Sequence, residues 1–230
     1  MKEKISLQTV LFDLDGVLID SGDDIAASVN ATLVRFGYKE EPQDVIIGFV
    51  GDGAKNLLIR ALDYQGIKAE SMPNFGEFFD RYVDRYRSHS TEKTVLYKGV
   101  YELLEKLNKE GIFCAVVSNK PLSATETILK HFAINGFFDA VVGPEQLSRI
   151  KPDPEGLALA LKLIEKKRNI SISPQRVLMV GDSATDIQAG RALGTHTCAV
   201  TEGFGNRQKL FAENADIVVR FAGELVRILF

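Results

Sequence analysis

Short apolar runs alternate with segments of helical periodicity along most of the chain. Six runs rich in Val, Ile and Phe predict buried strands at residues 9–14, 113–118, 140–143, 177–181, 197–201 and 217–219. Four helical patterns separate the later strands, at residues 122–132, 154–167, 184–193 and 208–214. Strict alternation of strand and helix favours a parallel sheet covered on both faces. The sequence therefore predicts an α/β protein with a doubly wound, Rossmann-like sheet.

One long interval breaks this alternation. The chain between residues 14 and 113 is far longer than a crossover helix requires, and its pattern is mostly helical. Three helices are predicted there: one after Ser21, with Ser21 and Asp24 as a capping box, a second within residues 51–66, and a third from residue 74 with an aromatic stripe. We therefore expect two domains. Residues 1–15 and 96–230 form the sheet-containing core, and residues 16–95 form an all-helical insert.

Composition narrows the class of protein. The chain has 230 residues, 45% of them hydrophobic, and a formal net charge of −3, which supplies no basic surface for nucleic acid. No apolar run has the length of a membrane span, and the N-terminus has no signal-peptide core, so we expect a cytoplasmic protein with no membrane partner. Cys114 and Cys198 lie in apolar segments, which predicts buried, unpaired thiols. The sequence leaves monomer and homodimer equally open.

The stretch VLFDLDGVLID places two acids, Asp13 and Asp15, within an apolar run. Burying an unpartnered charge costs several kcal/mol, so these acids need a reason to be there. Side chains two apart on a strand point the same way, which predicts that Asp13 and Asp15 project together while Phe12 and Leu14 turn to the core. Ligands of open parallel sheets bind beyond the carboxyl ends of the strands, where this pair lies.

Other polar residues are expected at the same edge of the sheet. The second strand ends at Ser118, with Asn119 and Lys120 following. Asp182 ends the strand in VLMVGDSATD with Asp186 one helical turn on, and RIKPDPEG supplies Lys151. Clustered carboxylates repel one another unless a cation lies among them. Oxygen ligands favour a hard divalent ion, and Mg²⁺ typically combines one or two carboxylates with water and substrate phosphate. The sequence therefore predicts a Mg²⁺ site.

With a cation in place, this set of residues is suited to phosphate-ester hydrolysis. Asp13 is positioned as a nucleophile toward phosphorus, and Asp15 as the group that protonates the leaving alkoxide and then activates water. Lys151 and the Ser118 hydroxyl would hold the non-bridging oxygens, with Asn119 beside them. We expect the helical insert to close over a small phosphorylated metabolite and exclude water.

Four ordered segments, FDLDGVLID, VVSNKP, IKPDPEG and VGDSATDIQAG, resemble the motifs of the haloacid-dehalogenase superfamily, and the insert resembles its helical cap. Within that superfamily, the sequence most resembles phosphoglycolate phosphatases, in the segments DSGDDIAASVNATL and FVGDGAKNLLIRAL. The resemblance implies Asp13 as nucleophile and Asp15 as general acid and base. It also implies Mg²⁺ binding by Asp13, the backbone carbonyl of Asp15, and Asp182, with Asp186 acting through water or steadying Lys151.

The substrate is less closely defined. Val17 stands where such phosphatases more often have threonine, and residues 95–100 and 201–210 also depart from the usual pattern. We take 2-phosphoglycolate as the leading candidate, with a sugar phosphate or pyrophosphate as alternatives. In the insert, the turn at Gly51, Asp52 and Gly53 precedes a helix and is either a site for a substrate anion or an ordinary loop.

Three rival functions and several ordinary structural roles remain open at this stage. A phosphoacceptor signalling domain needs no insert after its first strand, and a non-catalytic module has little reason to carry both Asp13 and Asp15. A sugar-phosphate mutase of the same fold is a closer alternative, although such mutases tend to have two adjacent acids where this chain has Gly181 before Asp182. Ser118 and Asp182 also suit helix capping, Asp186 also suits compensation of the helix dipole in a first turn, and Lys151 also suits a surface loop.

Overall fold

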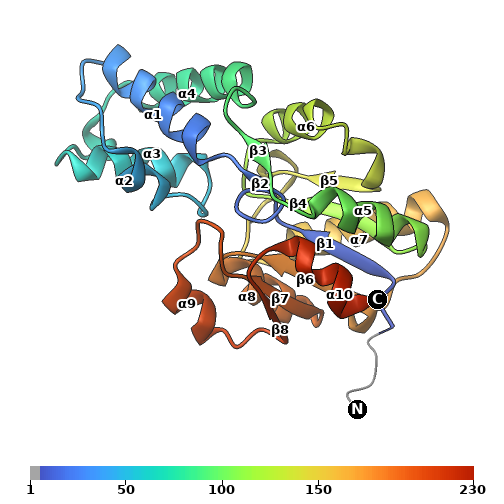
Figure 1. The fold of residues 1–230 in the computed structure, drawn as a ribbon. Coiled ribbons are helices and arrows are strands. Elements are labelled where there is room, and N and C mark those ends of the chain that lie inside the picture. Colours follow the sequence, from blue (N-terminus) through green and yellow to red (C-terminus); the bar gives the residue numbers. More distant parts are fainter. Residues whose placement is uncertain (1–5) are drawn as a thin grey trace.

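The computed structural model describes residues 6–230 and contains a six-stranded sheet in the order β5-β4-β1-β6-β7-β8 (Figure 1). The strands are β1 (Thr9–Phe12), β4 (Phe113–Val117), β5 (Ala140–Val142), β6 (Val177–Gly181), β7 (His196–Val200) and β8 (Ile217–Val219). Every neighbouring pair is parallel. The predicted α/β, doubly wound fold is confirmed, because the chain order reverses on either side of β1.

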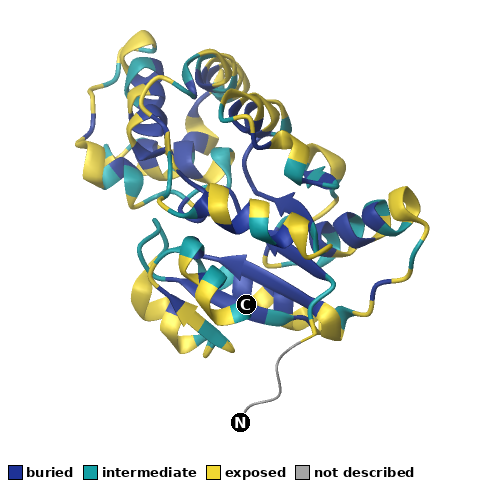
Figure 2. Ribbon diagram, turned by 45° about the vertical axis from the view of Figure 1, so that its right-hand side comes forward, coloured by how far each residue is buried: buried dark blue, intermediate teal, exposed yellow. Residues whose placement is uncertain are grey.

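Helices cover both faces of this sheet. One face packs against α5 (Val100–Lys109), α6 (Leu122–His131) and α10 (Leu225–Leu229), and the other against α7 (Glu155–Arg168) and α8 (Ala184–Leu193), with α9 (Arg207–Ala212) beside α8. Val10 and Phe12 of β1 enter the first core and Leu11 enters the second, so β1 is buried on both sides. The buried strands are seen at the centre of the molecule in Figure 2. Neither α5 nor α10 was predicted from the sequence.

Four helices form a separate group at the edge of the molecule: α1 (Gly22–Arg35), α2 (Gln43–Ile47), α3 (Ala54–Tyr64) and α4 (Phe75–His89) (Figure 1). Their apolar faces make a core of their own, in which Leu33, Leu58 and Phe78 are fully buried and into which Ala124 of α6 also packs. The aromatic stripe of α4 lies in this core, as its helical spacing predicts. The short α2 was not predicted. The domain boundaries at residues 15/16 and 95/96 stay a prediction.

A two-stranded antiparallel ribbon joins the helical group to the sheet. It consists of β2 (Ile19–Asp20) and β3 (Val95–Leu96), with Ile19 opposite Leu96. Each strand has only two residues, too few for a hydrophobic period to show, which is why the sequence predicted neither. The ribbon makes the two ends of the long insertion lie side by side.

The predicted capping box at Ser21 and Asp24 is wrong. The Ser21 side chain does not cap α1 and instead donates a hydrogen bond to Asp15. The buried Asp24 carboxylate accepts hydrogen bonds from the backbone N–H groups of Lys93 and Thr94 and from the Thr94 hydroxyl, at 2.7–3.0 Å. Asp24 thus ties the start of α1 to the segment where the insertion returns to the sheet, a contact between residues about seventy positions apart.

The first strand is shorter than predicted. β1 ends at Phe12, and Asp13 donates one further backbone hydrogen bond to Val180 before the chain turns. Phe12 and Leu14 are fully buried and Asp13 and Asp15 both reach the same crevice, as expected. Gly16 allows the turn because its φ of 78° lies in the left-handed region that favours glycine.

Cys114 and Cys198 are buried free thiols, as predicted, and burial raises the pKa of Cys114 to about 12. Among residues 6–230, we find no helix that combines the length and the apolar character needed to cross a membrane.

We expect Asp24→Ala to lower the free energy of unfolding by about 2–4 kcal/mol, because it leaves the part-buried N–H of Lys93 and the buried N–H and hydroxyl of Thr94 without their carboxylate acceptor. Denaturant unfolding measures the change. Asp23→Ala is the matched control, since Asp23 lies next to Asp24 on α1 but is exposed, and it should cost less than about 1 kcal/mol. Equal losses in the two variants would contradict this role for Asp24.

Candidate active site

The candidate site is a crevice between the carboxyl ends of the central strands and the helical group. From the sheet side, Asp13, Asp15, Ser118, Asn119 and Asp182 line it. From the helical group come mostly apolar and aromatic residues: Ile25, Val50, Ala54, Leu57, Tyr82 and Tyr86, together with Gly51 and Gly53. Polar chemistry therefore comes from the sheet, and the insert supplies an apolar wall.

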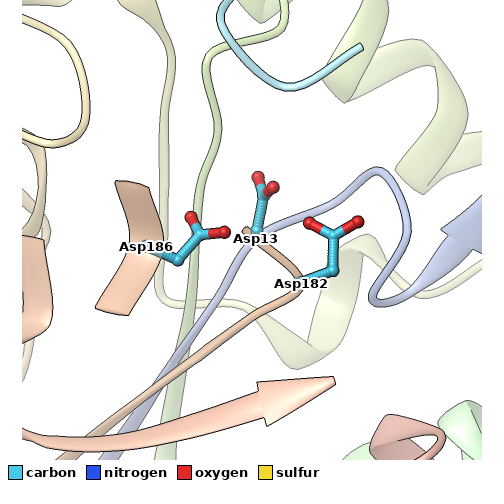
Figure 3. Close-up of side chains that lie close together, drawn as sticks. All are labelled: Asp13, Asp182 and Asp186. Carbon is cyan, nitrogen blue, oxygen red and sulfur yellow. The ribbon is translucent and has the colours of Figure 1, made fainter. Parts of the chain in front are cut away.

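Three buried carboxylates lie together at this edge of the sheet. Oxygen atoms of Asp13, Asp182 and Asp186 lie within 4.8 Å of one another, and Figure 3 shows the three side chains next to each other. Burial raises the pKa of Asp13 to about 6, the charges of Asp186 and Asp15 add to the increase, and Lys151 opposes it. Burial, together with Asp186 and Asp13, also raises the pKa of Asp182 well above its ordinary value. The cluster is therefore short of positive charge.

Lys151 is the cation inside this cluster. Its Nζ lies 2.9 Å from Asp13 Oδ1, 2.7 Å from Asp186 Oδ1 and 2.8 Å from the carbonyl oxygen of Val117. The contacts with the two carboxylates are ion pairs, and the Val117 carbonyl accepts a hydrogen bond from the ammonium group. Burial alone would lower the pKa of Lys151, but the charges of Asp13 and Asp186 outweigh burial and raise it. Lys151 is thus held as a buried cation next to Asp13.

The three carboxylates differ in how many of their oxygens already have a hydrogen-bond or ion-pair partner. Asp186 is fully engaged, because Oδ1 meets Lys151 while Oδ2 accepts hydrogen bonds from the backbone and hydroxyl of Ser183. Asp182 Oδ2 accepts from the backbone N–H groups of Phe204 and Gly205, at 2.6 and 3.1 Å. Within residues 6–230, no hydrogen bond or ion pair reaches Asp182 Oδ1 or Asp13 Oδ2. These two oxygens belong to acids that line the crevice, and they fit a hard divalent cation.

Two glycines make room for Asp182. A Cβ atom at Gly16 would lie 2.0 Å from Asp182 Oδ2, and one at Gly203 would lie 2.3 Å from the same atom. The loop that contains Phe204 therefore wraps closely around Asp182 and fixes the direction of its carboxylate. In the sequence, residues 201–210 stand out only as a departure from the pattern of phosphoglycolate phosphatases, and no local signal connects them with Asp182.

Asp15 pairs with Lys120, a residue that was given no role from the sequence. Lys120 Nζ lies 2.7 and 2.8 Å from the two carboxylate oxygens of Asp15, and both side chains are largely buried. The same ammonium group lies 4.4 Å from the centre of the Tyr86 ring, which belongs to α4 of the helical group. The only sequence signal was the position of Lys120 two residues after Ser118, because its side-chain direction depends on the fold.

The remaining predicted residues fall into two groups. Ser118 lines the crevice, and the Asn119 amide accepts from the backbone N–H of Lys151 and donates to the carbonyl of Gly51, thereby linking the helical group to the sheet. Gly51 and Gly53 line the crevice as well. The Asp52 side chain lies elsewhere: it pairs with Arg60 and borders two neighbouring surface hollows.

A strand-end cluster of acids and a lysine, facing a helical insertion, is the arrangement of a hydrolase with a covering domain. The chain belongs to the haloacid dehalogenase-like hydrolase family, whose model matches residues 10–200.

Relatives and solved structures agree with this placement. The chain is 34% identical over 217 residues to a phosphoglycolate phosphatase of Pseudomonas putida, covering 91% of this chain and 75% of that protein. It is 32% identical to an N-acetylmuramic acid 6-phosphate phosphatase of Pseudomonas aeruginosa, covering 99% and 96%. The crystal structure of a predicted phosphoglycolate phosphatase from Haemophilus somnus superposes with a TM-score of 0.87 at 28% identity, covering 98% and 99%.

We expect Gly16→Ala to abolish activity, because the new methyl group meets Asp182 in addition to straining a left-handed backbone. Gly37→Ala is the matched control, since Gly37 has a φ of 82° but no atom within 4 Å of its Cβ position. It should lose about 1–2 kcal/mol of stability and keep its turnover. Activity assays and thermal melts of both variants distinguish a blocked site from backbone strain, and an active Gly16→Ala enzyme would contradict the close fit around Asp182.

The raised pKa of Asp13 predicts a pH-dependent gain of stability in Asp13→Asn. The pKa of Asp13 in the folded protein, about 6, exceeds its ordinary value of 3.8, so the ionised carboxylate destabilises the metal-free protein above pH 6 and this cost disappears below about pH 4. Metal-free Asp13→Asn should therefore melt above the wild type at pH 8, with the difference shrinking toward pH 4. The exposed Asp80, changed to Asn, is the control and should show no such trend. A metal-free Asp13→Asn protein that melts below the wild type at pH 8 would refute this account.

Proposed function

We propose that this protein is a Mg²⁺-dependent phosphatase that hydrolyses a small phosphorylated metabolite through an aspartyl-phosphate intermediate on Asp13, with 2-phosphoglycolate as the leading substrate. The observation that carries the proposal is the buried cluster of Asp13, Lys151 and Asp182 at the strand ends, with one unengaged oxygen on each of the two acids. Membership in a hydrolase family and phosphatase relatives at 31–34% identity support it.

Asp13 is the proposed nucleophile. One oxygen of its carboxylate attacks phosphorus and forms an acyl phosphate, while the bond from phosphorus to the alcohol oxygen breaks. Lys151, held at Asp13 Oδ1, supplies a fixed positive charge beside the transferring group. Ser118 lines the same crevice and offers a hydroxyl to the phosphoryl oxygens.

Asp15 is the proposed proton carrier. It donates a proton to the leaving alkoxide in the first step and accepts one from the attacking water in the second, after which inorganic phosphate leaves and both acids are restored. Asp15 lines the crevice two residues from Asp13, and Ser21 and Lys120 fix its carboxyl group. The shared position of both acids at the end of one strand supports this division of roles.

Mg²⁺ is the cation that we assign to the site, with Asp13, Asp182 and the backbone carbonyl of Asp15 as its protein ligands. When bound, it supplies charge neutralisation for the phosphoryl oxygens. Asp186 is assigned a positioning role, since it holds Lys151 with one oxygen and the start of α8 with the other.

The substrate assignment rests on chemistry shared by the relatives. Phosphoglycolate and N-acetylmuramic acid 6-phosphate, which name two of the related phosphatases, are both phosphomonoesters of an alcohol that carries a carboxylic acid. We propose the same class for this chain, with the Gly51–Asp52–Gly53 turn contributing backbone groups to the substrate. A sugar-phosphate mutase is less favoured, because Gly181 offers no second acid beside Asp182.

A panel of phosphomonoesters that includes 2-phosphoglycolate, N-acetylmuramic acid 6-phosphate, a hexose 6-phosphate and pyrophosphate, assayed with Mg²⁺ and with chelator, tests the proposal. We expect phosphate release that requires Mg²⁺ and disappears in Asp13→Asn. Asp15→Asn should lose turnover by orders of magnitude, most severely for alkyl esters with poor leaving groups, because these need the proton most. Normal turnover in Asp13→Asn, or activity undiminished by chelator, would refute the mechanism.

A further inference from the structure

The crevice contains one cation, Lys120, to which the proposed chemistry gives no contact with the substrate, only the positioning of Asp15. Among the described residues that line it, Lys120 is the one with a positively charged side chain; Lys151 contacts Asp13 but is not one of the lining residues. Other basic residues near the opening are engaged or face elsewhere: Arg60 pairs with Asp52, and the exposed Lys55 borders a neighbouring hollow. Among the residues that line the crevice, Lys120 is therefore the one side-chain cation available to a negative charge on the alcohol part of a substrate.

The Lys120 ammonium group has one hydrogen-bond donor without an acceptor. An ammonium group carries three donors, and Lys120 Nζ spends two of them on Asp15. Its remaining contact is with the face of the Tyr86 ring, 4.4 Å from the ring centre. No oxygen among residues 6–230 accepts the third donor, although the side chain is only 4% exposed. A buried cation with an unused donor at a cavity wall is suited to receive an acceptor from a ligand.

Because the walls around Lys120 are apolar, an anionic substrate depends on Lys120 for a positively charged partner. Tyr82 and Tyr86 are stacked with ring centres 5.9 Å apart, and Ile25 and Leu57 complete an apolar surface. A carboxylate pushed against such a surface would lose its hydration without compensation. Because Lys120 also grips Asp15, the cation lies on the side of the crevice where the leaving alcohol departs.

We infer that Lys120 is a specificity-determining residue that binds a carboxylate on the alcohol part of the substrate, at the same time as it positions Asp15. This inference rests on the proposed phosphatase function and adds to it the side chain that selects for acid-bearing phosphomonoesters. The arrangement also explains the contact between sheet and insert: Tyr86 of α4 covers Lys120 on one side and closes the pocket for the substrate's carboxylate.

The test compares two phosphomonoesters of matched length, 2-phosphoglycolate and 2-hydroxyethyl phosphate, which differ in having a carboxylate or a hydroxymethyl group. The wild type should prefer 2-phosphoglycolate in kcat/KM. Lys120→Met, which keeps the apolar stem over Tyr86, should reduce this preference at least about tenfold, mainly through KM for 2-phosphoglycolate. Lys120→Arg should restore part of it. Lys120→Gln replaces the Met variant if that protein does not melt cooperatively.

Lys55→Met is the matched control and should leave the preference unchanged, because Lys55 is exposed and does not line the crevice. Equal loss on both esters in Lys120→Met would show that Lys120 only positions Asp15, and would overturn the inference. So would a wild type without preference for the carboxylate, in which case the phosphatase function itself still stands. A wild type that releases phosphate from no ester in the larger panel would remove the proposed function as well.

Discussion

The structure depends on the requirement that buried negative charge be balanced at the end of one strand. Asp13, Asp182 and Asp186 come together because parallel strands β1 and β6 are neighbours and both end at the same edge. One lysine, Lys151, cannot neutralise three carboxylates, and the raised pKa values of Asp13 and Asp182 are the physical sign of that deficit. A divalent cation and a phosphate ester are the chemistry that this imbalance suits.

Much of the surrounding structure serves to keep the carboxylates in fixed directions. Ser183 and Lys151 hold Asp186, the Phe204 loop holds Asp182, and Gly16 leaves the space that this requires. Buried carboxylates lower the stability of the protein when no ligand is bound. The two fully packed faces of the sheet supply the rigidity that tolerates this loss. The site is thus organised before a substrate arrives, which is the condition for electrostatic catalysis.

The helical group contributes in a different way. It has its own core and reaches the sheet through the β2–β3 ribbon, the Asp24 contacts and the Asn119 to Gly51 hydrogen bond. Its face toward the crevice is apolar and aromatic, and in the proposed function this face would exclude water and shape the space for the alcohol part of the substrate. Charge for recognition at that wall comes from Lys120, which belongs to the sheet side but is covered by Tyr86.

The sequence alone determined the alternation of strands and helices, the long insertion and the acids at strand ends, since periodicity and buried charge are local signals. It predicted Asp13, Asp15, Ser118, Lys151 and Asp182 at one edge because parallel strands end together. Only the tertiary structure decided which oxygens remain free, that Ser21 and Asp24 bind distant partners in place of capping α1, and that Lys120 joins Asp15 to Tyr86. These contacts link residues far apart in the chain, and no local pattern encodes the direction of a side chain across a crevice.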